Sequence, residues 1–196
     1  MSQLLTPQLL RLHEAAVEDG RRHLLRRSLF GQIAADSGRH AIGVAGPRGA
    51  GKTILLRQLA ATLDDTFYLS ADTLEPDADL FEIAESLGSG MRVRTLLVDE
   101  LHFLPNGFAA LKKITDFLPV RVIFTSSVAL ALKESAHDLS RRVAVHDLDY
   151  FSFAEFLKFR HGRDLPLLGL GDILGGRWAA AHLLSGSRFG EYLGGG

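Results

Sequence analysis

The sequence predicts a three-layer α/β domain built on a five-stranded parallel sheet. Short apolar runs alternate with segments whose apolar residues recur at helical spacing, which is the order expected for a parallel sheet with helices on both faces. Two of the runs, TLLV and VIF, are continuous rather than alternating, as is typical of strands buried on both sides. The chain has 196 residues, 46% of them hydrophobic, which is enough for one domain with a full core.

The apolar runs and the segments with helical spacing predict the strands and helices of this domain. Strands are expected at residues 40–45, 66–70, 94–99, 120–126 and 142–148. Helices are expected at residues 54–63, 79–87, 108–117 and 128–136. After the last strand, Ser152 and Glu155 form a capping-box pattern for a helix that ends near His161.

A helical extension precedes this domain. Thr6 and Pro7 mark the start of a helix that is expected to end at Gly20, and a second helix is expected at about residues 21–36. We therefore predict a helical N-terminal extension over residues 1–37.

The core is expected over residues 38–161, and a different composition follows it. Residues 162–196 are rich in glycine, with little apolar periodicity. This segment is expected to be a partial C-terminal lid or a truncated linker, so the chain is either a natural short form or part of a longer one.

Residues 46–53, GPRGAGKT, match the phosphate-binding pattern G-x-x-x-x-G-K-[ST]. The glycines allow backbone N–H groups to surround a β-phosphate, and the helix that follows adds its dipole. Lys52 is expected to reach the β- and γ-phosphate oxygens, and Thr53 to place its hydroxyl on Mg²⁺. The alternative is a plain glycine-rich turn, but an apolar strand before it and an amphipathic helix after it favour the phosphate site. The expected nucleotide contacts are Gly46, Pro47, Arg48, Gly49, Ala50, Gly51, Lys52, Thr53 and Ile54.

An acidic pair ends the strand TLLVD. Asp99 is placed to hold the Mg²⁺ shell, as a Walker-B carboxylate does. Glu100 follows directly and is the candidate base for a water in line with the γ-phosphate. Such a pair can also be a helix cap, but its position after a phosphate loop and one intervening strand favours catalysis.

The strand VRVIFTS is expected to be inserted between the phosphate-loop strand and the strand that ends at Asp99. Its end would then lie between Lys52 and Glu100, which makes Ser126 and Ser127 candidates for a hydroxyl that binds the attacking water or the γ-phosphate. The alternative is a serine-rich turn that caps the next helix.

These residues favour ATP hydrolysis over related reactions. The guanine signature N/T-K-x-D is missing from the sequence, which disfavours a GTPase. Glu100 supplies a base for water, which disfavours a small-molecule kinase. The alternative to an ATPase is a nucleotide-dependent switch that binds ATP with little turnover.

Four ordered segments resemble the AAA+ ATPases of bacteria and archaea, over roughly residues 38–160. They are GPRGAGKTILLRQL, TLLVDELHFLP, IFTSSVAL and LSRRVAVHDLDYFSFAEFL, with a weaker likeness in EYLGGG. The group they resemble belongs to the archaeal and origin-recognition-related branch and carries a C-terminal domain of unknown function. The resemblance implies a P-loop NTPase fold, with ATP and Mg²⁺ as cofactors.

The resemblance also implies a role for Arg142. In this family an arginine near this position often reaches the γ-phosphate of a neighbouring subunit, and the alternative is a surface arginine. The sequence departs from the family where Ser126 replaces a glycine, where Arg141 precedes Arg142 in place of glycine, and where residues 149–151 replace a proline.

Composition limits the partners. The formal net charge of −1 argues against a protein whose overall field collects nucleic acid or anionic membrane. There is no cysteine, the N-terminus lacks the order of a secretory signal, and no apolar run approaches the ~18 residues of a membrane span. A cytoplasmic location is expected, with a homo-oligomer or a protein as partner.

Nucleic acid stays open as a partner because of local charge. The basic cluster Arg21, Arg22, Arg26 and Arg27 is either a binding surface or a solvated helix face. The eight histidines show no metal spacing.

Overall fold

The computed structural model describes residues 6–38, 40–127, 142–165, 168–178 and 185–194. The chain divides into two compact units, Met1–Asp149 and Tyr150–Gly196. The predicted helix at residues 128–136 lies outside the described residues.

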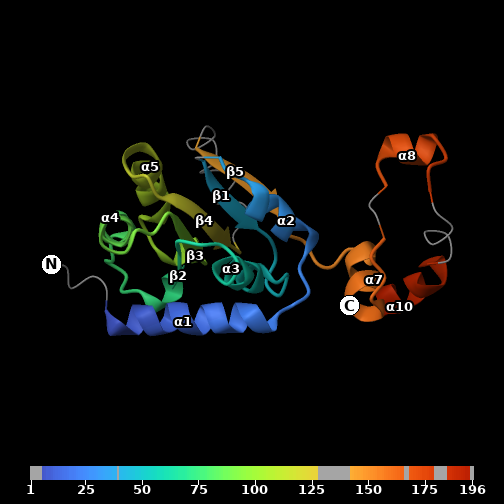
Figure 1. Ribbon diagram of the computed structural model, residues 1–196, viewed down its shortest axis with the longest axis horizontal. Coiled ribbons are helices and arrows are strands. Elements are labelled where there is room, and N and C mark those ends of the chain that lie inside the picture. Colours follow the sequence, from blue (N-terminus) through green and yellow to red (C-terminus); the bar gives the residue numbers. More distant parts are fainter. Residues whose placement is uncertain (1–5, 39, 128–141, 166–167, 179–184, 195–196) are drawn as a thin grey trace. The chain divides into compact units, whose positions relative to one another are not determined.

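The first unit contains a five-stranded sheet in which all strand pairs are parallel (Figure 1). The strands are β1 (Ala41–Ala45), β2 (Thr66–Ser70), β3 (Thr95–Asp99), β4 (Arg121–Ser126) and β5 (Val143–Asp147). Their order is β2-β3-β4-β1-β5. β4 therefore lies between β1 and β3, which confirms the predicted insertion of that strand.

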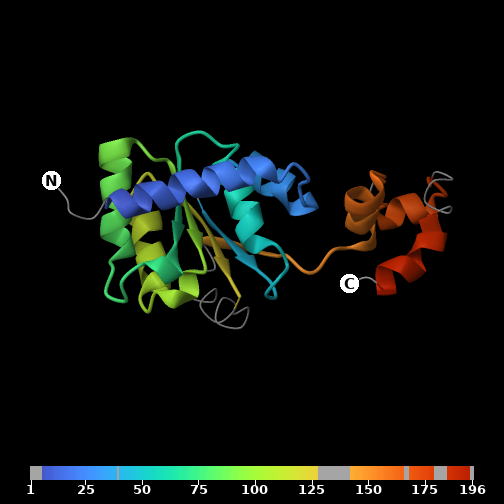
Figure 2. The same cartoon turned by 90° about the horizontal axis from the view of Figure 1, so that it is seen from below.

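Helices cover both faces of the sheet, as predicted (Figure 2). One face carries α1 (Pro7–Arg22), α2 (Ser28–Ala35) and α3 (Lys52–Ala60), and the other carries α4 (Leu80–Met91) and α5 (Gly107–Phe117). Neighbouring residues of one strand serve both layers: Leu97 packs with the α3 face and Leu96 with the α4 and α5 face, and both are fully buried. The continuous apolar strands are thereby explained, and the predicted α/β P-loop NTPase fold is confirmed.

The helix α1 continues beyond its predicted end. It runs to Arg22, although Gly20 was expected to end it. A Cβ at Gly20 would lie 2.0 Å from the carbonyl oxygen of Arg57 on α3. The glycine is therefore required for the close approach of two helices and is no stop signal.

The second predicted helix is shorter than expected, because residues 23–27 are not helical and α2 starts only at Ser28. Gln58 Nε2 donates to the carbonyl oxygens of His23 (2.6 Å) and Leu25 (2.9 Å). A side chain of α3 thus satisfies the backbone of the connection in place of a helical turn.

The second unit contains α7 (Phe153–His161), α8 (Leu170–Leu174), a 3₁₀ turn (Ser185–Arg188) and α10 (Phe189–Gly194). The predicted capping box is confirmed: Ser152 Oγ accepts from Glu155 N (3.2 Å), and Glu155 Oε2 accepts from Ser152 N (3.1 Å). The sequence places this helix in the core over residues 38–161, and that domain boundary stays a prediction.

An aromatic cluster connects α7 and α10. The ring centroid of Phe153 lies 5.2 Å from that of Phe189 and 5.6 Å from that of Tyr192. The ring centroids of Phe156 and Tyr192 are also 5.6 Å apart. Tyr192 also donates from its hydroxyl to the carbonyl oxygen of Phe151 (2.7 Å). These contacts give the glycine-rich segment a packing partner that its weak apolar periodicity did not predict.

Candidate nucleotide-binding site

The loop at residues 46–53 connects β1 to α3 at the carboxyl end of the sheet. Gly49 and Gly51 have φ values of +81° and +92°, a conformation that side chains rarely adopt. A Cβ at Gly46 would lie 2.1 Å from the carbonyl oxygen of Leu148, which follows β5. Glycine is thus required at three positions of the loop, twice by backbone conformation and once by close packing.

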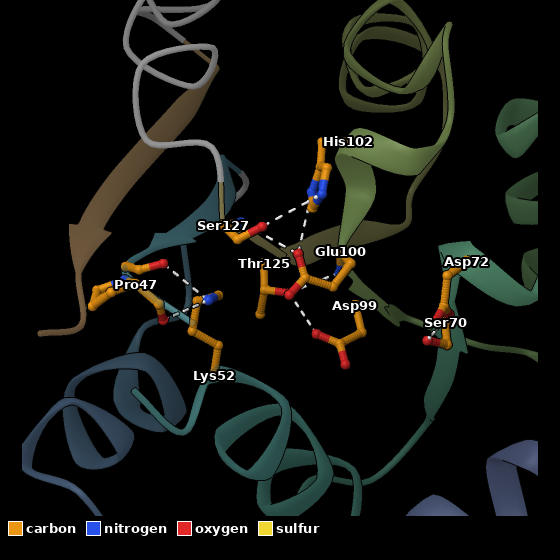
Figure 3. Close-up of polar contacts among 10 residues, drawn as sticks. Pro47, Lys52, Ser70, Asp72, Asp99, Glu100, His102, Thr125 and Ser127 are labelled. Carbon is orange, nitrogen blue, oxygen red and sulfur yellow. Dashed lines mark hydrogen bonds and ion pairs between the residues drawn. The ribbon is translucent and has the colours of Figure 1, made fainter. Parts of the chain in front are cut away.

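Lys52 begins α3 and is 4% exposed. Its Nζ donates to the carbonyl oxygens of Gly46 (2.9 Å) and Pro47 (3.0 Å), so the side chain lies back across the loop (Figure 3). The ammonium group is therefore held against the backbone of the loop, and Lys52 also lines the cavity described below.

Arg27 supports the loop from outside. Its two terminal nitrogens donate to the carbonyl oxygens of Ala50 (2.7 Å) and Asp149 (2.9 Å), and the residue is 9% exposed. By binding both carbonyl oxygens, Arg27 connects the loop to the backbone that follows β5. The sequence placed Arg27 in a basic cluster, and it is buried here instead.

The other arginines of that cluster have separate surroundings. Arg22 pairs with Glu18 at 2.5 Å on α1, and Arg26 donates to Thr62 (3.0 Å) with its guanidinium 4.2 Å from the Phe30 ring centroid. Because Arg26 and Arg27 make different contacts, the cluster is not one solvated helix face.

Asp99 ends β3 and is held by two hydroxyls. Its Oδ1 accepts from Thr125 Oγ1 on β4 (Figure 3). Its Oδ2 accepts from the Tyr68 hydroxyl (3.0 Å) on β2. Burial, and next the charge of Asp99, raise the pKa of Tyr68 to about 12, so its hydroxyl remains a proton donor at neutral pH. Asp99 is 3% exposed. Its orientation is thereby fixed by strands on either side.

Thr125 is a site residue that the sequence reading missed. Its Oγ1 accepts from the Glu100 N–H (2.8 Å) while donating to Asp99. One threonine thus binds both members of the acidic pair. The signal was available, because Thr125 follows the apolar run VIF at the end of a strand expected to neighbour β3.

Glu100 has a left-handed backbone, with φ +52°, and its carboxylate meets β4 and the turn after β3. Glu100 Oε2 accepts from Ser127 N (3.3 Å) and lies 3.2 Å from His102 Nδ1. Ser127 Oγ lies 3.4 Å from His102 Nε2 (Figure 3). The structure therefore brings Ser127 to Glu100, as predicted for that strand end, and adds His102.

A cavity of about 470 Å³ is lined both by residues of the loop and by Glu100, but not by Asp99. The loop and the start of α3 contribute Arg48, Gly49, Gly51, Lys52, Thr53 and Ile54, and the turns after β2 and β3 contribute Asp72, Glu100 and Phe103. Asp72 lies in the turn Ala71–Thr73 after β2, and Phe103 in the turn Leu101–Phe103 after β3. Neither was among the residues expected at the site.

Two other candidates lie apart from this cavity. Ser126 is fully buried at the last position of β4, opposite Ala45 in the strand pairing. Arg142 directly precedes β5 and donates to both Asp116 carboxylate oxygens, at 2.7 and 3.1 Å. Because β5 is parallel to β1, Arg142 lies at the opposite edge of the sheet from the loop that follows β1.

Among the described residues, no group of three or more histidine, aspartate or glutamate side chains could hold a metal ion. Over the same part of the chain, none of the helices combines the length and apolar character needed to cross a bilayer.

The parallel sheet and its glycine-rich loop define a P-loop NTPase domain. A family model described as an AAA domain matches residues 38–157, more than half of the chain. The chain therefore belongs to the AAA domain family, and it is an AAA-type P-loop ATPase module. The narrower grouping with the archaeal and origin-recognition-related branch stays a prediction.

A structure described as the structural basis for katanin self-assembly matches with 18% identity and a TM-score of 0.45, over 80% of this chain. The chain spans 58% of the length of that structure. No curated protein matches the chain.

Proposed function

We propose that this chain binds Mg-ATP at residues 46–54 and hydrolyses it to drive a conformational change in a lid, a neighbouring subunit or a partner. The water oxygen would bond to the γ-phosphorus as the bond to the ADP oxygen breaks, and the water proton would pass to the Glu100 carboxylate. Lys52 would neutralise the γ-phosphate, and Ser127, rather than buried Ser126, would bind the water or that phosphate.

The observation that carries this proposal is the shared cavity. Lys52 and Thr53 line it from the loop and Glu100 from the turn after β3, so a γ-phosphate held by the lysine would share the cavity with the carboxylate. The amino end of the nine-residue helix α3 adds a partial positive charge on the loop side. The phosphates would thus bind at the loop, whereas the negatively charged carboxylate of Glu100 belongs to a different segment of the chain.

The oxygen donors suit Mg²⁺, which prefers hard ligands. Thr53 is among the residues that line the cavity, whereas Asp99 is not, and each Asp99 oxygen accepts one hydrogen bond. Each of these oxygens keeps a further lone pair, so Thr53 and Asp99 are the residues that would hold the ion. When bound, the ion would neutralise charge on the β- and γ-phosphate oxygens.

Phosphate release tests the proposal directly. The purified chain with Mg-ATP should release many phosphates per protein molecule, and EDTA should stop the release. Coupled detection of free phosphate would measure the rate, and a filter-binding assay on the same samples would measure bound ATP. Tight binding without repeated release would overturn the ATPase proposal.

A switch that binds ATP with little turnover is the second candidate. It is favoured by the contacts of Glu100 Oε2 with Ser127 N and His102, because a carboxylate held there must still reach a water. A slow first cleavage followed by retained ADP in the same assay would support the switch.

A neighbouring subunit would be needed for Arg142 to act. Within its own unit it lies at the sheet edge opposite the loop, so its guanidinium would have to meet the γ-phosphate of another copy. The hydrogen bond from Arg142 lowers the pKa of Asp116. Asp116 is therefore ionised at neutral pH and holds the guanidinium. An exposed pair of this kind contributes little to stability, so exchanging it for a phosphate costs little.

Turnover per subunit should therefore rise with protein concentration, and Arg142→Ala should remove that rise without weakening ATP binding. An arginine supplied between subunits can contribute ~10³–10⁵ in rate. Initial rates over a wide dilution series would measure the effect. Asp116→Asn is the matched control, because it frees Arg142 and should keep the rise. A flat profile in the wild type would contradict the shared site.

A further inference from the structure

We propose that His102 is a positioning residue for Glu100. Its ring would hold one carboxylate oxygen, Oε2, beside Ser127, and leave the other oxygen to take the proton from water. This inference rests on the proposed hydrolysis and deepens it, since it names a residue that acts on the reaction through Glu100.

Three polar contacts close a small array around the carboxylate (Figure 3). Oε2 is 3.2 Å from His102 Nδ1 and 3.3 Å from Ser127 N, while His102 Nε2 is 3.4 Å from Ser127 Oγ. The same carboxylate oxygen is engaged from the turn after β3 and from the end of β4. Rotation of the Glu100 side chain would break contacts with both.

The His102 ring is itself well held. Its side chain is 17% exposed, its ring centroid lies 4.6 Å from that of Phe103 with the two rings tilted by 32°, and its neighbour Leu101 is fully buried in the core. Glu100 is anchored at its backbone by the bond from its N–H to Thr125. Glu100 is thus held both at its backbone and at its carboxylate, so it loses little conformational freedom when the substrate binds. Such a held group is oriented efficiently for reaction.

His102 Nδ1 is buried, and in the described part of the chain it lacks a hydrogen bond. Such an atom is unusual, because buried polar groups are nearly always paired. It lies 3.2 Å from Oε2, so a small rotation would complete the bond. Catalytic hydrogen bonds are often long without substrate and tighten when it binds. A neutral ring protonated at Nδ1 would donate to Glu100 and accept from Ser127 at Nε2.

Two substitutions separate this role from simple packing. His102→Leu keeps the bulk beside Phe103 and removes both nitrogens, whereas His102→Asn keeps an N–H donor near the position of Nδ1. Single-turnover cleavage of bound ATP should slow by ~10- to 100-fold in His102→Leu, since a small misplacement of a catalytic group has effects of that size. His102→Asn should recover most of the rate. Affinity for a fluorescent ATP analogue should stay within about twofold of wild type in both, because the loop is untouched.

The decisive measurement repeats His102→Leu in a Glu100→Gln background. Because His102 acts through Glu100, the second substitution should add almost no further loss. A full multiplicative loss would show that His102 acts elsewhere, and an unchanged rate in His102→Leu alone would also overturn the proposal. Thermal unfolding checks the fold, and His102→Ala replaces the leucine variant if that one fails to fold.

The same data distinguish the two proposals. A wild type that binds ATP but never releases phosphate overturns the ATPase function and the role of His102 together. A wild type that turns over normally beside an unaffected His102→Leu overturns only the positioning role.

Discussion

Replacing Lys52 with alanine should abolish useful Mg-ATP affinity while leaving the sheet folded. Nζ is held over the loop by two carbonyl oxygens, and the backbone N–H groups alone cannot neutralise a γ-phosphate. Removing one partner of a buried charge pair costs roughly 2–5 kcal/mol, which is about 30-fold to several-thousand-fold in affinity. Titration calorimetry with Mg-ATP would measure the loss, and circular dichroism would report the fold.

The matched control is Lys112→Ala, which removes the same charge from an exposed position on α5. It should bind ATP as the wild type does. An equal loss in both variants would point to a general charge effect. Affinity like that of the wild type in Lys52→Ala would reject residues 46–54 as the nucleotide site.

Much of the fold could be predicted because one signal dominates it. A strand buried on both faces must be apolar at every position, and β3 and β4 showed this in TLLV and VIF. Their ends then placed Asp99, Glu100 and Ser127 at one edge, because parallel strands end together. The site residues found by pattern therefore lie on strand ends or in the loop.

The sequence could not predict which distant residues a given side chain or glycine contacts in the folded chain. Gly20 resembled a helix stop, but it is there because Arg57 on α3 passes 2.0 Å from where its Cβ would be. Arg27 resembled part of a basic surface, yet it turns inward to Ala50 and Asp149. Such contacts join residues far apart in the chain, and no local period reports them.

The same limit explains the missed polar partners of the acidic pair. Thr125 was passed over for the serines after it, although it is the hydroxyl that binds Asp99 and the Glu100 backbone. His102 was not expected at the site, because the histidines were considered only as metal ligands and show no metal spacing. The 3₁₀ turn Leu101–Phe103 brings its ring back to Glu100.

Replacing Glu100 with glutamine should leave ATP bound and slow its cleavage by ~10²-fold or more, because general-base assistance is typically worth 10²–10⁴. Glutamine has the same length, and its carbonyl oxygen can still accept from Ser127 N, so the geometry of the array is kept. Its amide cannot take a proton from water at neutral pH. Single-turnover cleavage of bound ATP would measure the chemical step apart from product release.

A matched control and the two outcomes for Glu100→Gln decide whether Glu100 acts in catalysis or only in the structure. Glu85→Gln makes the same change at an exposed position on α4 and should cleave ATP at the wild-type rate. If Glu100→Gln also cleaves at that rate, Glu100 has only a structural role, and its backbone bond to Thr125 would be the reason for its left-handed conformation. If cleavage is lost with affinity intact, the carboxylate is required for the chemical step, because the backbone, the loop and the cavity are the same in both proteins.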